Sequence, residues 1–132
     1  MRKQSKTTKK KPKISTYSNK AKKLWSRIVK ERAGYRCEYC GSTQYLNSHH
    51  HYSVRCAPLK YDLDNGVCLC SSHHIWDTKF SAHRTPALFV KWIEAKRGKV
   101  WARNLELKNQ MIVNYKINDL KKIIKGLEEE LE

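Results

Sequence analysis

Residues 37–74 read CEYCGSTQYLNSHHHYSVRCAPLKYDLDNGVCLCSSHH, and this stretch holds all five cysteines and five of the six histidines of the chain. It opens on a Cys-x-x-Cys pair, carries three consecutive histidines in its middle, and closes on a second cysteine pair followed by two histidines. Thiolates and imidazoles are the usual ligands of zinc, and this density favours metal binding over disulfides. We therefore predict that metal ligands organise the fold around this segment.

Two Cys-x-x-ligand turns lie about thirty residues apart in the stretch. Such turns can meet across a small fold and complete a tetrahedral zinc site. The spacing predicts that Cys37, Cys40, Cys70 and His73 bind one structural zinc ion, with Cys68 as the competing fourth ligand. Cys56 has no partner at metal-ligand spacing and is expected to be a free or packed thiol.

The charge of the chain is strongly positive and unevenly distributed. Lys and Arg number 28 against 12 Asp and Glu, for a net charge of +16. Residues 1–36 carry 14 basic and 1 acidic side chain (+13), which leaves 14 and 11 (+3) for residues 37–132. A basic arm and first helix predict contact with a polyanion such as nucleic acid, and the alternative is a solubilising or localisation tail.

The length of 132 residues is typical of one domain with tails. We expect a disordered basic arm at 1–16, a domain at 17–103 and a C-terminal amphipathic helix at 104–132. No apolar run approaches the roughly 20 residues that span a membrane, and no signal peptide follows the basic start. These features predict a cytoplasmic protein with no membrane contact.

The hydrophobic pattern predicts an α+β fold. A first helix begins after a cap at Ser18 or Asn19 and stops near Gly34. Strands are expected at 44–52 and 66–70, followed by a helix at 71–80 with Ile75, Trp76 and Phe80 on apolar positions. Thr85 and Pro86 start a further helix that Gly98 ends. From about residue 105 a heptad-like seam predicts a last helix that either packs back on the domain or dimerises.

The order of these residues resembles the HNH endonucleases of the ββα-metal (His-Me finger) fold over about residues 20–83. The motifs that carry the resemblance are LNSHH at 46–50, DNGVCLC at 64–70 and the pair at 73–74. It is closest to small phage nucleases of recombination or packaging. The resemblance implies a small ββα core with structural zinc, flanked by N-terminal and C-terminal helices, and the cytoplasm of a host cell if the chain is phage-encoded.

The resemblance also implies site roles. His49 and His74 would hold a divalent catalytic cation (Mg²⁺, Mn²⁺ or Ni²⁺), His50 would be the general base, and Asn65 would brace the loop that bears it. Hydrolysis of a phosphodiester needs such a base and such a cation. A slip of one residue in the histidine run would instead make His50 the ligand and His51 the base.

The expected substrate is DNA, which the enzyme would nick or cut. His83 is a candidate third metal ligand or phosphate contact, or else a structural residue. Rival readings are a zinc-containing DNA-binding module without catalysis, and an assembly factor that recruits phage packaging or recombination proteins through its C-terminal helix. The side chains expected to contact DNA phosphates are Lys20, Lys23, Arg27, Arg55, Lys79 and Arg84.

Overall fold

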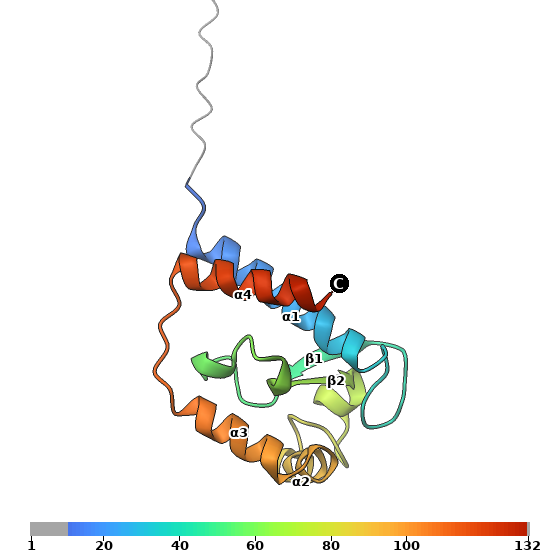
Figure 1. The fold of residues 1–132 in the computed structure, drawn as a ribbon. Helices are drawn as coiled ribbons and strands as arrows, with labels where there is room; N and C mark the ends of the chain where they lie inside the picture. The colour runs from blue at the N-terminus through green and yellow to red at the C-terminus, as the bar shows by residue number, and fades with distance from the viewer. Residues whose placement is uncertain (1–10, 132) are drawn as a thin grey trace, which may run out of the picture.

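The structure of the protein, a computed structural model, describes residues 11–131; residues 1–10 of the arm predicted at 1–16 lie outside the described residues. A two-stranded antiparallel sheet lies between α1 and α4 on one side and α2 and α3 on the other (Figure 1). The prediction of an α+β fold is confirmed. The elements are α1 (Ile14–Arg32), β1 (Leu46–His50), β2 (Gly66–Cys70), α2 (Pro86–Arg97), α3 (Lys99–Asn109) and α4 (Ile117–Glu130).

Helix α1 packs its apolar stripe against the sheet. It begins at Ile14, earlier than the predicted cap at Ser18 or Asn19, and it ends just before Gly34, whose φ of +65° fits the predicted stop. The side chains of Trp25 and Val29 are buried against β2, together with Cys68. This contact gives the strand one of its two covered faces.

The two strands set the positions of the histidine run. β1 pairs with β2 so that His49 lies opposite Val67 and His50 opposite Gly66. All five residues of β2 are buried, because α1 covers one face and Phe89 and Ile93 of α2 pack on the other. The strand is therefore a fixed support for the residues at its two ends.

The chain after β2 makes one five-residue helical turn, η3 (Ser72–Trp76), so the helix predicted over 71–80 is wrong in length. The Asp77 carboxylate accepts hydrogen bonds from the backbone N–H groups of Lys79 (2.7 Å) and Phe80 (3.3 Å). Such a side chain replaces the helical bonds of the next turn and ends the helix. Trp76 is correspondingly 64% exposed instead of lying on an apolar face.

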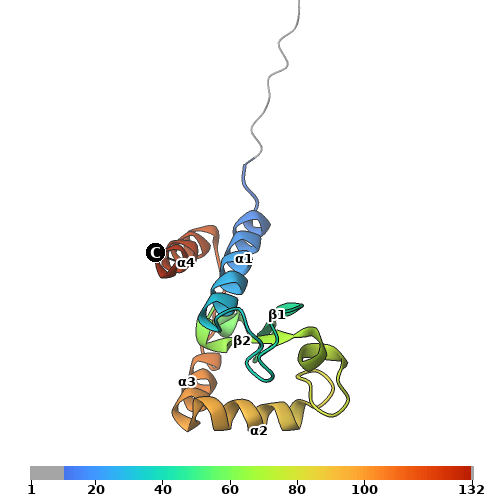
Figure 2. The same cartoon turned by 90° about the vertical axis from the view of Figure 1, so that its right-hand side faces the viewer.

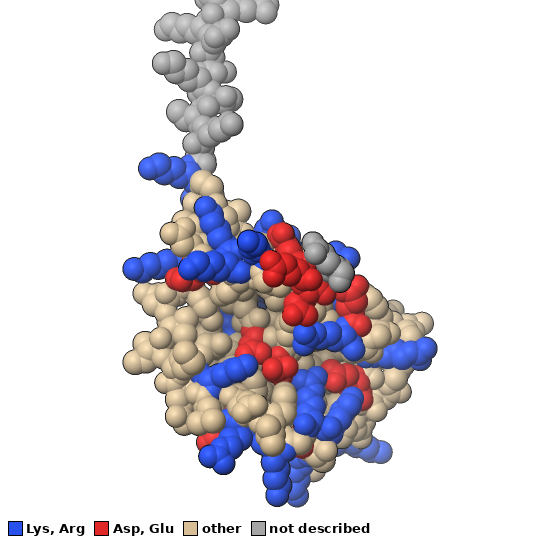
Figure 3. All heavy atoms as spheres, viewed as in Figure 1, with Lys and Arg blue, Asp and Glu red and all other residues tan. Residues whose placement is uncertain are grey.

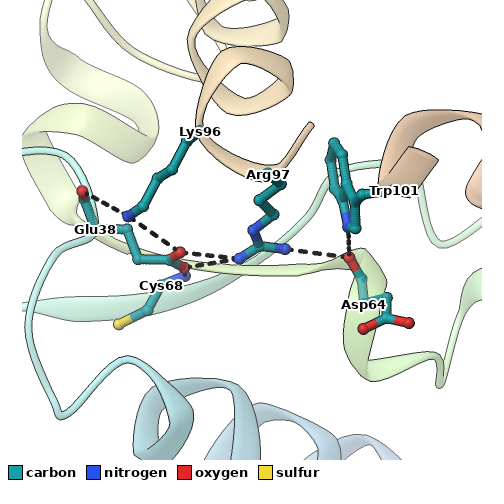
Figure 4. Close-up of polar contacts among 6 residues, drawn as sticks. All are labelled: Glu38, Asp64, Cys68, Lys96, Arg97 and Trp101. Carbon is teal, nitrogen blue, oxygen red and sulfur yellow. Dashed lines mark hydrogen bonds and ion pairs between the residues drawn. The ribbon is translucent and has the colours of Figure 1, made fainter. Parts of the chain in front are cut away.

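Helices α2 and α3 meet at an angle (Figure 2), and the bend lies at Gly98 with φ +95°. The predicted start at Thr85 and Pro86 and the predicted stop at Gly98 are both confirmed. At this bend, Arg97 donates to the Glu38 carboxylate and to the Asp64 carbonyl oxygen (Figure 4). The bend thus ties the Cys37–Cys40 turn to the loop before β2.

The C-terminal segment is two helices rather than the one predicted over 104–132. Residues 110–116 are non-helical and cross the molecule, and the Tyr115 hydroxyl donates to the Ala57 carbonyl oxygen on the way. The seam residues Leu120, Ile124 and Leu127 of α4 are buried within the molecule, on the side where α4 lies along α1. Of the two alternatives for this helix, the structure has the one that packs back.

Charge also joins α4 to α1. Lys20 lies 3.3 Å from Glu128, and Arg32 lies 3.1 Å from Glu130. Acidic side chains gather near the C-terminal end of the chain, among the Lys and Arg residues on the face shown in Figure 3. Within residues 11–131 there is no helix with the length and apolar character needed to cross a membrane.

Candidate functional site

Three cysteines and one histidine form the first cluster, and they come from three segments. Cys37 and Cys40 lie on the turn after α1, Cys70 ends β2, and His73 belongs to η3. Their ligand atoms all lie within 4.8 Å of one another. The Cys70 sulfur is 3.8 Å from that of Cys40 and 3.2 Å from His73 Nδ1. These four side chains are close enough together to hold a metal ion, as the sequence predicted.

The turn at Cys37 is shaped for anionic sulfur. Gly41, at φ +78°, closes it by donating from its N–H to the Cys37 carbonyl oxygen at 2.8 Å. Burial by itself raises the pKa of the Cys37 thiol, but hydrogen bonds from the backbone N–H groups of Cys40, Cys70 and Tyr39 outweigh burial and lower this pKa overall. A thiolate is the form that binds metal.

Cys68, the competing fourth ligand, lies elsewhere. Its side chain is fully buried against Trp25, Ile28 and Val29 of α1, and it is not in the four-residue cluster. Burial, followed by the nearby Glu38 carboxylate, raises the pKa of its thiol to about 11. Cys68 is therefore a core residue with a neutral thiol, and the structure places His73 in the fourth position.

Three histidines form a second cluster beside the first. The ligand atoms of His49, His74 and His83 lie within 4.8 Å of one another, and His74 Nε2 is 3.2 Å from His83 Nε2. Backbone hydrogen bonds from Ala82 to His73 (2.9 Å) and from His83 to His74 (3.1 Å) hold the loop before α2 against η3. His83, whose role the sequence left open, thus joins the two predicted cation ligands.

Two histidines of this second cluster, His49 and His74, favour their neutral form. Burial, reinforced by the proximity of His74 and His83, lowers the pKa of His49 to about 3. Burial and then His83 lower the pKa of His74 to about 4. A neutral imidazole keeps the lone pair that a metal ion needs. At neutral pH these two side chains therefore present nitrogen ligands without having to release protons.

His50 points to the other side of β1 from its neighbour, as strand alternation requires. Its ring stacks on Trp25 with centroids 3.8 Å apart and planes 10° apart, and its Nε2 is 2.9 Å from the Lys60 carbonyl oxygen. A carbonyl oxygen only accepts, so Nε2 carries the proton and the neutral ring has its lone pair on Nδ1. Burial lowers the pKa of His50, which favours this neutral form.

Asn65 is fully buried and holds the loop that follows His50. Its Oδ1 accepts from the Tyr52 N–H at 2.7 Å, and its Nδ2 donates to the carbonyl oxygens of Tyr52 (2.9 Å) and Leu59 (3.1 Å). Its own carbonyl oxygen accepts from the His51 N–H at 2.8 Å. This amide therefore fixes both ends of the segment that connects the two strands.

The histidine run and the second cluster share one cleft of about 500 Å³. Its wall also includes Trp25, Phe89 and Lys22. His51 lies at the cleft as well, with its ring 5.1 Å from that of Trp101, and no described residue is hydrogen-bonded to its buried Nδ1. Sequence reasoning did not single out Lys22, whose only signal was its place on the basic face of α1.

The residues predicted to contact DNA are scattered over the surface. Lys20 is taken up by its ion pair with Glu128. Lys23 and Arg27 line a groove on the outer face of α1. The other three predicted contacts are exposed and lie on loops, and they are Arg55, Lys79 and Arg84.

Comparisons with protein-family models, with curated proteins and with solved structures found no match to this chain. The two side-chain clusters and the cleft are therefore the observations from which function is inferred.

Proposed function

We propose that the protein is a metal-dependent DNA endonuclease of the HNH type. The observation that carries the proposal is that His50 and the cluster of His49, His74 and His83 line the same cleft while their rings serve different contacts. His50 is thus free for proton transfer beside the three histidines that would hold a cation. Hydrolysis of a phosphodiester needs these two functions side by side.

His50 would be the general base. Its Nε2–H is held by the Lys60 carbonyl oxygen and its ring by the stack on Trp25, so the lone pair on Nδ1 has a fixed direction. This nitrogen would take a proton from the water that attacks phosphorus. Asn65 would be a positioning residue, because it holds the loop whose Lys60 carbonyl oxygen accepts from His50.

The second cluster suits a divalent cation, because its possible donors are three imidazole side chains from three separate segments. A cation bound there would supply positive charge to the phosphate oxygens and to the departing 3′ oxygen. His49 and His74 are the ligands that the resemblance implies, and His83, whose ring lies beside theirs, would be a third. The remaining coordination positions would be open toward the cleft.

The first cluster would hold zinc in a structural role, because three thiolates and one imidazole are a typical closed zinc set. His73 and His74 are adjacent on η3, so a metal that fixes the first of them also orients the second. Zinc would therefore stabilise the fold and position one ligand of the other cluster.

The test is nicking of supercoiled plasmid with added Mg²⁺, Mn²⁺ or Ni²⁺, compared with no added cation. His50→Ala should lower the rate by about 10²- to 10⁴-fold, the usual contribution of a general base. His51→Ala is the matched control, since it removes a neighbouring cleft imidazole and should retain most activity. Zinc content and circular dichroism confirm that both variants are folded.

Two outcomes would contradict the proposal. Equal nicking rates for His50→Ala and the parent would show that His50 is not the general base. A loss of nicking in His51→Ala alone would assign the general base to His51. DNA binding without nicking under all three cations would favour the rival reading of a zinc-containing DNA-binding module.

A further inference from the structure

A second groove, of about 630 Å³, runs along the outer face of α1, and none of the residues that line it belongs to the histidine or cysteine cluster. Four cationic side chains line it, and Tyr35 stands just beyond the end of the helix. The groove shares Lys22 and Ser26 with the histidine cleft, so the two hollows are continuous. The cations are Lys22, Lys23, Arg27 and Lys30.

These four charges differ from the other cations of α1. Lys20 and Arg32 are ion-paired with Glu128 and Glu130 of α4, whereas none of the four groove cations lies within 4.0 Å of a described carboxylate. The acidic end of α4 therefore neutralises one side of α1 and leaves the groove side positive. A row of unpaired cations on one helix face suits the phosphates of a nucleic acid.

The length of the row limits what it can hold. Lys22 and Lys30 are eight residues apart, which is about 12 Å at 1.5 Å per residue. That distance corresponds to about three or four nucleotides at the 3.4 Å rise of one fully stacked strand, and to fewer if the strand is extended. The groove therefore fits a short stretch of a single strand leading into the cleft.

Tyr35 supplies the feature that distinguishes a single strand from a duplex. Its side chain is 47% exposed, and its φ of +54° is in the left-handed region that bulky residues rarely adopt. The fold holds it there through a hydrogen bond from its N–H to the Lys30 carbonyl oxygen at 2.9 Å. An exposed ring at the end of a row of phosphate-binding cations can stack on an unpaired base, whereas the bases inside a duplex are covered on both faces by their neighbours.

We propose that this groove binds a single-stranded arm of the DNA substrate, with its phosphates on Lys23, Arg27 and Lys30 and one unpaired base stacked on Tyr35. The inference rests on the proposed function, because it takes the adjoining cleft to act on DNA. It adds that the preferred substrate carries an overhang, flap or branch next to the bond that is cut.

The test is binding of a fluorescein-labelled 20-nucleotide single strand, a blunt duplex and a duplex with a single-stranded overhang, followed by anisotropy without added divalent cation. We expect the single strand and the overhang to bind about tenfold more tightly than the blunt duplex. Tyr35→Gly should remove most of this preference, since one base stack is worth roughly 5- to 150-fold in affinity. Glycine accepts a positive φ, so this variant should fold at least as well as the parent.

Tyr35→Phe is the matched control, because it keeps the ring and should bind as the parent does. Lys23→Gln should weaken binding of the single strand and reduce the slope of log K against log salt by about 0.7. Equal affinity of the parent for blunt duplex and single strand, or unchanged single-strand affinity in Tyr35→Gly, would overturn the inference.

The binding result is separate from the nicking result. A protein that nicks plasmid but shows no dependence on Tyr35 would keep the proposed function and refute the single-strand groove. A protein that binds the single strand through Tyr35 but never nicks plasmid would refute the proposed nuclease function and keep the groove as a single-strand binding site.

Discussion

Arg97 is the residue whose replacement tests most directly how the site is held together. Its Nη2 lies 2.9 and 3.1 Å from the two carboxylate oxygens of Glu38, and its Nη1 lies 3.1 Å from the Asp64 carbonyl oxygen. The Glu38 carboxylate also accepts from the Cys68 N–H at 2.7 Å (Figure 4). One guanidinium therefore connects α2, the Cys37–Cys40 turn and the loop before Asn65.

Arg97→Met should lower the free energy of unfolding by about 2–3 kcal/mol. A hydrogen bond to a charged group contributes about 1.5–3 kcal/mol, and removing one partner of a fully buried pair costs about 3–5 kcal/mol. The side chains of Arg97 and Glu38 are 21% and 13% exposed, so water screens the pair in part and the lower end applies.

Lys96→Met is the matched control on the same helix. The Lys96 Nζ is 3.5 Å from the Glu38 carboxylate and its side chain is 41% exposed, so its pair should contribute less than about 1 kcal/mol. The measurement is urea unfolding of the zinc-loaded proteins, followed by tryptophan fluorescence and by circular dichroism. The double variant of Glu38→Gln and Arg97→Met should lose less than the sum of the single losses.

Two results would refute this reasoning. One is a loss of less than about 0.5 kcal/mol for Arg97→Met, which would mean that solvent competes fully with the pair. The other is an equal loss for Lys96→Met, which would mean that net charge rather than geometry stabilises the turn.

Three further predictions concern the cysteines, the glycines and pH. Cys70→Ser should abolish the expected single zinc per chain, while Cys68→Ser should keep it, and metal analysis of both decides. Gly66→Ala should destabilise by about 1–3 kcal/mol, because its Cβ would lie 2.2 Å from a methyl group of α1, whereas Gly126→Ala in the open interior of α4 should stabilise by about 0.5–1 kcal/mol in the same urea assay. Between pH 6.5 and 5 the unfolded chain binds more protons than the folded one, since the pKa of His49 falls to about 3 on folding. As the pH is lowered through this range, the free energy of unfolding should decrease more steeply in the parent than in His49→Gln, by up to about 1.4 kcal/mol per pH unit. Parallel curves of stability against pH for the two proteins would contradict this assignment.

Local chemistry allowed several elements to be predicted correctly. Pro86 can start a helix because its missing N–H is not needed there, and Gly98 can end one because it tolerates φ +95°. The spacing within Cys37–Cys40 and within Cys70–His73 likewise predicted two pairs of ligands, because a Cys-x-x-ligand turn brings both ligand atoms to one side. Each of these signals depends only on residues near in sequence.

The choice between Cys68 and His73 could not be made from spacing. Residues two apart in a strand face the same side, so strand alternation alone would place the side chains of Cys68 and Cys70 on the same face of β2. The structure separates them, because Trp25 and Val29 of α1 enclose Cys68 while Cys70 lies at the strand end beside the Cys37–Cys40 turn. The packing of a distant helix, which no local pattern encodes, decided the ligand.

The C-terminal seam shows the same limit. Leu120, Ile124 and Leu127 are spaced for burial, but the spacing is equally compatible with a second copy of the chain or with α1. The surface that buries these residues depends on where residues 110–116 place α4, and the Tyr115 hydroxyl fixes that segment by its hydrogen bond to the Ala57 carbonyl oxygen. The apolar pattern thus predicted burial without predicting the partner.

The sequence by itself determined the α+β class, the helix limits at Pro86 and Gly98, and the segment that bears the first cluster and two histidines of the second, because caps, alternation and ligand spacing act over a few residues. Only the tertiary structure decided that His83 joins His49 and His74, that η3 ends at Trp76, and that α4 lies on α1. These outcomes depend on contacts between segments far apart in the chain, where burial and charge pairing outweigh local preference.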